Sequence, residues 1–320
     1  MPFCTIVMYH YVRPLASSRY PEIKGLTLDE FRVQLDFLLS QYHPVTVDEL
    51  LAALNEKRGL PDRALMLTFD DGFIDHYIHV FPILDAKGVQ GVFFPPTKAI
   101  EDKAALDVHK IHHILSRVQN HETLVKEIFQ TLDELRQVFH LESNETYFQK
   151  LAVANRFDPK EIIFVKRLLQ VELPLEARRQ VVQKLFERYL DVDEKVFASE
   201  LYMTCDQLET MVRHGHVIGG HGYEHVWLNA LEPADLEREI GKTGDFLARI
   251  GMDAKKKNRV FSYPYGGHSD LVIQKLKDAG YQAAFGTRFA PARVERDNAF
   301  DLERLDTNDF PPKRSPTHAA

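Results

Sequence analysis

The sequence contains few cysteines and no excess of positive charge. Its 320 residues include only two cysteines, Cys4 and Cys205, so neither a disulfide framework nor a cysteine metal site is expected. The net charge of −7 argues against nucleic acid as a partner, because neutralising phosphates requires clustered Lys and Arg. The short basic run Lys255–Lys257 is interpreted as a solvated loop.

Long apolar runs are also absent. No segment approaches the roughly 18 apolar residues of a membrane span. The first residues, MPFCTIVMYHYVRP, lack the basic stretch, apolar run and small-residue cleavage site of a signal peptide. We therefore expect a cytoplasmic protein without a membrane span. The hydrophobic content of 44% is typical of a globular chain that buries a large core.

Short β-rich runs alternate with helical spacing along much of the chain. One predicted helix begins after Thr27, with Glu30 three residues later in a capping box. This alternation predicts an α/β fold with a parallel sheet, open or closed into a barrel. The predicted strands are Thr5–Tyr9, Ala64–Phe69, Gly91–Phe94, His216–Gly219, Arg259–Tyr263 and Ala283–Thr287.

A stretch from about residue 101 to 199 has helical periodicity and almost no strand signal. We interpret it as a large helical insertion in a discontinuous domain formed by residues 1–100 and 200–310. Because its apolar stripes must be buried, we expect it to cover one rim of a barrel mouth or to form a homodimer contact. His109 and His113 within it are interpreted as the polar face of a helix, and residues 311–320 as a disordered tail.

Two adjacent carboxylates, Asp70 and Asp71, follow the strand Ala64–Phe69 and precede Gly72. In α/β folds functional groups gather at the carboxyl ends of strands. A buried pair of carboxylates is costly unless a positive charge compensates it, and a metal ion can do so. One carboxylate could then bind the ion while the other accepts a proton. The alternative is a helix N-cap.

Two further strand ends carry polar or glycine-rich segments. The run His216–Gly220 ends in glycines and is followed by His221 and His225, two imidazoles that could bind one ion. The strand Arg259–Tyr263 leads into Pro264–Gly267, where exposed backbone N–H groups could hold an oxyanion, although an ordinary turn has the same pattern.

Together the three segments resemble the polysaccharide deacetylase (NodB-homology) family of carbohydrate esterases. Thr68–Gly72 matches the family's first motif completely. His221 and His225 match the second in spacing, and Pro264–Tyr265 matches the third. The resemblance covers about residues 1–100 and 200–310. It implies a distorted (β/α) barrel, usually of seven strands.

The resemblance also implies roles for individual residues. Asp70 would be the general base, and Asp71, His221 and His225 would bind a divalent metal, usually Zn²⁺, with Co²⁺, Ni²⁺ or Mn²⁺ as alternatives. The metal would polarise the acyl carbonyl and activate a water molecule. The backbone N–H of Tyr265 would help to hold the oxyanion.

The chain departs from the family pattern at three places. The arginine of the third motif is absent, with Ser262 nearby, and Arg304 is our candidate to orient the base in its place. Gly222 replaces a hydroxyl residue that would support the histidine loop. The late Leu-x-His motif, whose histidine is usually the general acid, is not found.

His10, at the end of the first predicted strand, is therefore our candidate for the general acid, and His268 is its rival. A similar Tyr-His pair occurs in the branch of the family that acts on exported glucosamine polymers.

The resulting hypothesis is a metal-dependent N-deacetylase of an N-acetylated sugar or glycan precursor. The first alternative is a hydrolase of a non-sugar amide or imide C–N bond. The second is a catalytically silent carbohydrate-binding protein, which would need neither a base nor a metal.

Overall fold

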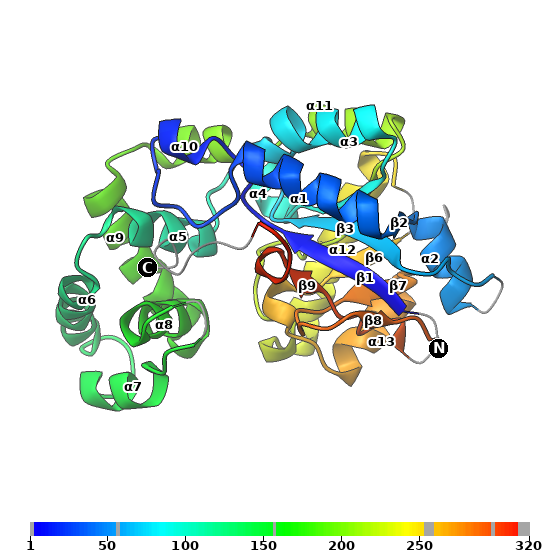
Figure 1. Cartoon of the computed structure of the whole chain (residues 1–320). Helices are drawn as coiled ribbons and strands as arrows, with labels where there is room; N and C mark the ends of the chain where they lie inside the picture. Colours follow the sequence, from blue (N-terminus) through cyan, green and yellow to red (C-terminus); the bar gives the residue numbers. More distant parts are fainter. Residues whose placement is uncertain (1–2, 56–57, 156–157, 253–258, 296–297, 313–320) are drawn as a thin grey trace. The chain divides into compact units, whose positions relative to one another are not determined.

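The computed structural model describes residues 3–55, 58–155, 158–252, 259–295 and 298–312 (Figure 1). The chain forms two compact units. The larger contains residues 1–14, 25–104 and 198–313, and the smaller contains residues 15–24, 105–197 and 314–320. The run Lys255–Lys257 and most of the tail predicted to be disordered lie outside the described residues.

A mostly parallel sheet lies at the centre of the larger unit. Its strand order is β5-β4-β3-β1-β8, with β2 paired to β3 and β9 paired to β1. All of its neighbouring strands are parallel except β8, which is antiparallel to β1. The strands are β1 (Phe3–Tyr9), β2 (His43–Pro44), β3 (Ala64–Asp70), β4 (Gly91–Phe94), β5 (Val217–Ile218), β8 (Ala292–Arg293) and β9 (Leu305–Asp306).

Two more strands, β6 (Val260–Ser262) and β7 (Ala283–Phe285), form a second parallel sheet. Single bridges link it to neighbouring segments, Gly220 to Phe261 and Phe285 to Leu302. The predicted α/β class is confirmed, and all six predicted strands are present. The short β2, β8 and β9 were not predicted, because two residues carry too little periodicity to be recognised.

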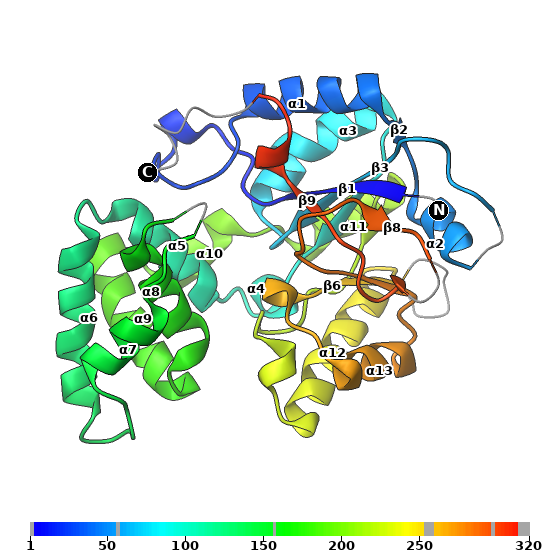
Figure 2. The same ribbon diagram turned by 60° about the horizontal axis from the view of Figure 1, so that its bottom comes forward.

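In the described part of the larger unit, seven α-helices flank these strands. The capping box of α1 is present: Glu30 N–H donates to Thr27 Oγ1 (3.2 Å) and Thr27 N–H donates to Glu30 Oε2 (2.7 Å). Helices α1 and α3 lie on the same side of β1 and β3 (Figure 1), and α12 and α13 lie side by side near β6 (Figure 2). A π-helical turn, His76–Val80, leads into α3. The helices are α1 (Leu28–Gln41), α2 (Val47–Leu54), α3 (Phe81–Lys87), α4 (Thr97–Glu101), α11 (Cys205–Arg213), α12 (Pro233–Arg249) and α13 (Asp270–Asp278).

The strands are held together by an apolar core that includes Ile6, Met66, Val92, Val217 and Phe285, all nearly inaccessible to solvent. Because β1, β3, β4 and β5 are parallel, their carboxyl ends lie at one edge. The residues that follow these strands are the ones in which the sequence predicts chemistry.

The described part of the smaller unit is entirely helical outside its loops. Its helices are α5 (Asp107–Arg117), α6 (His121–Leu135), α7 (Asn144–Leu151), α8 (Lys160–Arg167) and α9 (Leu175–Leu190), and α10 (Glu194–Leu201) contains the boundary between the units. The predicted stripes are buried at Leu124, Ile128 and Leu132 in α6 and at Leu185 and Phe186 in α9. Among the described residues, no helix combines the length and apolar character needed to cross a membrane.

The interpretation of His109 and His113 as a polar helix face is wrong. Their exposed fractions are 0% and 1%. The His113 ring makes edge-on contacts with the rings of Tyr20 and Phe197, each at 4.8 Å. Aromatic packing explains the burial of His113, because an imidazole can act as a ring as well as a polar group.

The strand end before the histidine loop depends on a close backbone approach at Gly219. A Cβ there would overlap the Phe94 ring and lie 2.7 Å from Val260 O. In contrast, a Cβ at Gly241, inside α12, would meet nothing within 4 Å. The two glycines therefore have different physical roles.

We predict opposite effects of Gly219→Ala and Gly241→Ala on the free energy of unfolding. Gly219→Ala should lower it by about 1–3 kcal/mol, because it overpacks the site. Gly241→Ala should raise it by about 0.5–1 kcal/mol, because alanine favours a helix interior. Urea unfolding of both variants measures this, and equal shifts would contradict the packing argument.

Candidate active site

The adjacent aspartates at the end of β3 are both buried, with exposed fractions of 2% for Asp70 and 3% for Asp71. Asp71 has a φ of 74°, in the left-handed region that aspartate adopts more readily than most residues. Its N–H donates to Phe94 O (3.0 Å), so that Asp71 still pairs with the end of β4. The two side chains then meet different partners.

Asp70 is paired with Arg304, whose side chain is fully buried. Arg304 Nη1 donates to Asp70 Oδ1 (2.9 Å) and Nη2 donates to Asp70 Oδ2 (2.7 Å), a bidentate arrangement. Ser262 Oγ also donates to Asp70 Oδ2 (3.2 Å). Burial raises the pKa of Asp70, but the charge of Arg304 and, next, that of His221 outweigh it and hold the pKa below its usual value. The site therefore keeps Asp70 ionised.

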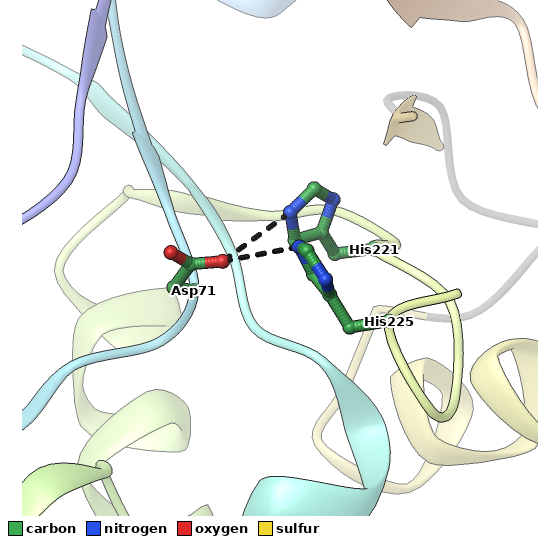
Figure 3. Close-up of side chains that lie close together, drawn as sticks. All are labelled: Asp71, His221 and His225. Atoms are coloured by element: carbon green, nitrogen blue, oxygen red, sulfur yellow. Dashed lines mark ion pairs between the residues drawn. The ribbon is translucent and has the colours of Figure 1, made fainter. Parts of the chain in front are cut away.

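Asp71 instead faces two imidazoles (Figure 3). Its Oδ1 lies 3.6 Å from Nε2 of His221 and 3.3 Å from Nε2 of His225. One ligand atom from each residue lies within 4.8 Å of the others, and all three residues are buried. Among the described residues this is the one group of His, Cys, Asp and Glu side chains found close enough together to hold a metal ion. His109 and His113 belong to no such group within the part of the chain that the structure describes.

The protonation of His221 fits a bound cation. Its Nδ1 lies 2.7 Å from Ser262 O, and because a carbonyl can only accept, Nδ1 carries the proton. In its neutral form this imidazole would direct a lone pair from Nε2 towards the Asp71 carboxylate, 3.6 Å away. A cation between them, a metal ion or a proton, removes the repulsion. Two imidazoles and one carboxylate, with a carbonyl orienting an imidazole, are the donors of many catalytic zinc sites.

The third strand end brings Tyr265 to the histidines. Tyr265 has a φ of 57° within the short helical turn Pro264–Gly266. Its ring makes an edge-on contact with His225 at 4.8 Å and stacks on Trp227 at 5.0 Å. Trp227 was not predicted as part of the site, and its position two residues after His225 is the one signal that the sequence offered.

The two candidate acids have different surroundings. The carbonyl of His10 accepts a hydrogen bond from His76 Nε2 (2.7 Å), and His10 follows β1, whose Tyr9 lies opposite Phe69 of β3. His268 stacks on Tyr263 at 4.7 Å, and its Nε2 lies 3.7 Å from Asp301 Oδ1. His10 therefore lies at the strand end that carries Asp70, and both assignments of the acid stay predictions.

We predict that Arg304→Met lowers the free energy of unfolding by about 3–5 kcal/mol, because it leaves the Asp70 carboxylate buried without its partner. Adding Asp70→Asn should recover part of that loss, since it removes the unpaired charge. A double-mutant cycle from urea unfolding measures the coupling. Additive losses in the double variant would mean that the pair carries no interaction energy.

Comparisons with known proteins identify the family. The polysaccharide deacetylase family model matches residues 57–157 and 182–284, which include parts of the helical segment that the motifs alone did not cover. The chain is 28% identical over 302 residues to YxkH of Bacillus subtilis, whose name assigns it to the polysaccharide deacetylases, covering 94% of this chain and 70% of that one.

A second relative is the poly-β-1,6-N-acetyl-D-glucosamine N-deacetylase of Escherichia coli K12. It is 31% identical over 137 residues, which are 42% of this chain and 19% of that protein.

Among solved structures, the fold is similar to that of Streptococcus pyogenes deacetylase PplD in complex with acetate. The TM-score is 0.57, the identity is 16%, and the match covers 96% of this chain and 93% of that one. The family expected from the three motifs is confirmed: this chain belongs to the polysaccharide deacetylases.

Proposed function

We propose that the chain is a metal-dependent N-deacetylase, which hydrolyses the N-acetyl or another N-acyl group of an amino sugar or glycan precursor. The observation that carries the proposal is the division of the adjacent carboxylates. Asp70 is paired with Arg304, whereas Asp71 faces His221 and His225. Hydrolysis assisted by a metal needs both a base and a separate set of ligands.

Each residue has a defined task in this proposal. Asp71, His221 and His225 would hold the metal, which when bound polarises the acyl carbonyl and makes water more acidic. Asp70 takes the proton of the attacking water, since Arg304 keeps its carboxylate ionised and oriented. The backbone N–H of Tyr265 donates to the oxyanion that forms on the acyl carbon.

The leaving nitrogen also needs a proton, and we assign this role to His10. Water adds to the acyl carbon and gives its proton to Asp70. The C–N bond then breaks as His10 protonates the nitrogen, and the products are a carboxylate and a free amine. The parallel register that pairs Tyr9 with Phe69 places His10 and Asp70 at neighbouring strand ends and supports this assignment.

The donor set favours Zn²⁺ as the metal, with Co²⁺, Ni²⁺ and Mn²⁺ as alternatives. The Escherichia coli relative, named for poly-β-1,6-N-acetyl-D-glucosamine, supports β-1,6-linked N-acetylglucosamine oligomers as the first substrate to test. Nucleotide-linked and lipid-linked N-acetyl sugars are the second group, because they suit a cytoplasmic chain. Non-sugar amides and imides represent the alternative C–N hydrolase.

The test of this function is acetate release. We predict that the chain frees acetate from one of the N-acetyl sugars, loses the activity with a chelator and regains it with Zn²⁺ or Co²⁺. Asp70→Asn should keep the metal but lose on the order of 10²–10⁴-fold in rate, the contribution of a general base. Asp71→Asn should instead weaken metal binding, because it removes a ligand.

Three results would contradict the proposal. Turnover of an amide or imide, with none of any N-acetyl sugar, favours the first alternative. Sugar binding without turnover under every metal favours the carbohydrate-binding protein. Normal metal content and normal rates in both aspartate variants would overturn the assigned roles.

A separate prediction distinguishes the two candidate acids. His10→Ala should keep the metal, lower the rate and remove the alkaline limb of the pH–rate profile, where a protonated acid is lost. His268→Ala is the matched control and should keep that limb. The reverse pattern would assign the acid to His268.

Two sequence-based expectations stay predictions. The first is that the helical segment at about 101–199 either forms a homodimer contact or covers one rim of a barrel mouth. Light scattering measures the oligomeric state and so tests the homodimer. Cell fractionation tests the cytoplasmic location.

A further inference from the structure

Three residues, Gly222–Glu224, separate the proposed metal ligands His221 and His225. They form no helix or strand. Gly222 has a φ of 74° and His225 a φ of 55°, both in the left-handed region. Such a segment has little intrinsic preference for one conformation, so the spacing of the two imidazoles depends on contacts from outside the loop.

The backbone of the loop is held from two sides. Its carbonyls accept hydrogen bonds from the first turn of α4: Thr97 N–H donates to Gly222 O (3.0 Å) and Lys98 N–H to Tyr223 O (2.9 Å). Its amides point to α12. The N–H groups of Tyr223 and Glu224 both donate to one carboxylate oxygen, Oε2 of Glu239, at 2.8 and 3.0 Å.

We propose that Glu239 is a positioning residue, which fixes the loop between His221 and His225 and thereby the spacing of the metal ligands. This inference rests on the proposed function for its chemistry. Glu239 has an exposed fraction of 1%, and a buried carboxylate is costly unless hydrogen bonds satisfy it. Hydrogen bonds from N–H groups to a carboxylate are stronger than those between neutral groups. Without Glu239, two loop amides would lose their acceptor.

Two neighbouring features fit this role. A Cβ at Gly222 would lie 3.3 Å from Glu239 Oε2, so that glycine leaves room for the carboxylate next to the loop. Lys242, one helical turn beyond Glu239, holds its ammonium 3.8 Å from the centre of the Tyr223 ring. Helix α12 therefore contacts both the backbone and a side chain of the loop.

The experiment measures Co²⁺ binding by the full-length, chelator-treated chain, together with its visible absorption spectrum and thermal unfolding. Glu239→Ala should lower the Co²⁺ affinity about 10–100-fold, the usual effect of removing a group that orients a ligand. Glu239→Asp should also lower it, because the shorter side chain withdraws the acceptor. Glu239→Gln should keep most of the affinity, because an amide oxygen can still accept both N–H groups.

Glu49→Ala is the matched control. The Oε2 of Glu49 accepts from Thr46 N–H (2.9 Å) in the capping box of α2. Its loss should cost stability, about 0.5–2 kcal/mol as for other lost helix caps, without changing Co²⁺ affinity or spectrum. A fall in affinity limited to the Glu239 variants therefore separates positioning from general destabilisation.

Folded Glu239→Ala with the affinity and spectrum of the wild type would overturn the inference. If Glu239→Ala does not fold, equal Co²⁺ affinities of Glu239→Asp and Glu239→Gln would do so. A wild-type chain that binds no Co²⁺ overturns both this inference and the proposed function. A chain that binds Co²⁺ but releases no acetate contradicts the proposed function alone, and the Glu239 comparison remains decisive.

Discussion

The buried guanidinium of Arg304 is the interaction on which the candidate site most depends. Its five N–H groups meet acceptors on three strand ends. Nε donates to Gly286 O (2.9 Å), Nη1 to Thr68 Oγ1 (3.1 Å) and Asp70 Oδ1 (2.9 Å), and Nη2 to Asp70 Oδ2 (2.7 Å) and Ser262 Oγ (3.0 Å). A fully buried charge is stable only when it is paired and its donors are satisfied, and here both conditions hold. One side chain thus orients the proposed base and fixes it against the ends of β3, β6 and β7.

Backbone strain gathers around the same edge. Asp71, His225 and Tyr265 all have left-handed φ values, 74°, 55° and 57°. Each such residue costs of order 1–3 kcal/mol and persists only where its surroundings determine it. Asp71 is held by its backbone hydrogen bond to Phe94, and the Tyr265 ring contacts the rings of Trp227 and His225. The loops are therefore held in their strained conformations by packing and hydrogen bonds at the strand ends, and the ligand geometry does not rely on the loops alone.

Local patterns predicted much of this arrangement. The strand Ala64–Phe69 and the capping box at Thr27 depend on neighbouring residues, so the sequence was sufficient to find them. Arg304 could be suggested as a partner for the base, because the motif arginine was missing, but its five acceptors come from distant segments. Glu239 was not predicted, since at the sequence level it is one more charged residue in an amphipathic helix. His113 was misinterpreted because its burial depends on distant aromatic rings.

The proposed role of Glu239 would account for a chain that has no hydroxyl residue at position 222. The sequence alone indicated the loss of a support for the histidine loop. The structure supplies another acceptor from α12, Glu239, where Gly222 leaves space for it.

The two adjacent carboxylates are also separated by the kind of charge that compensates them. Two buried carboxylates side by side would raise each other's pKa if they shared one environment. Asp70 has a permanent counter-charge, because arginine carries its charge without needing a bound ion. Asp71 has imidazoles, which become a source of positive charge only with a proton or a metal ion. The proposed base, Asp70, is thus compensated by the fixed charge of Arg304. The proposed ligand, Asp71, is compensated by a proton or a metal ion, which can exchange. With this separation, a metal at the proposed ligands could bind or leave without removing the counter-charge of the proposed base.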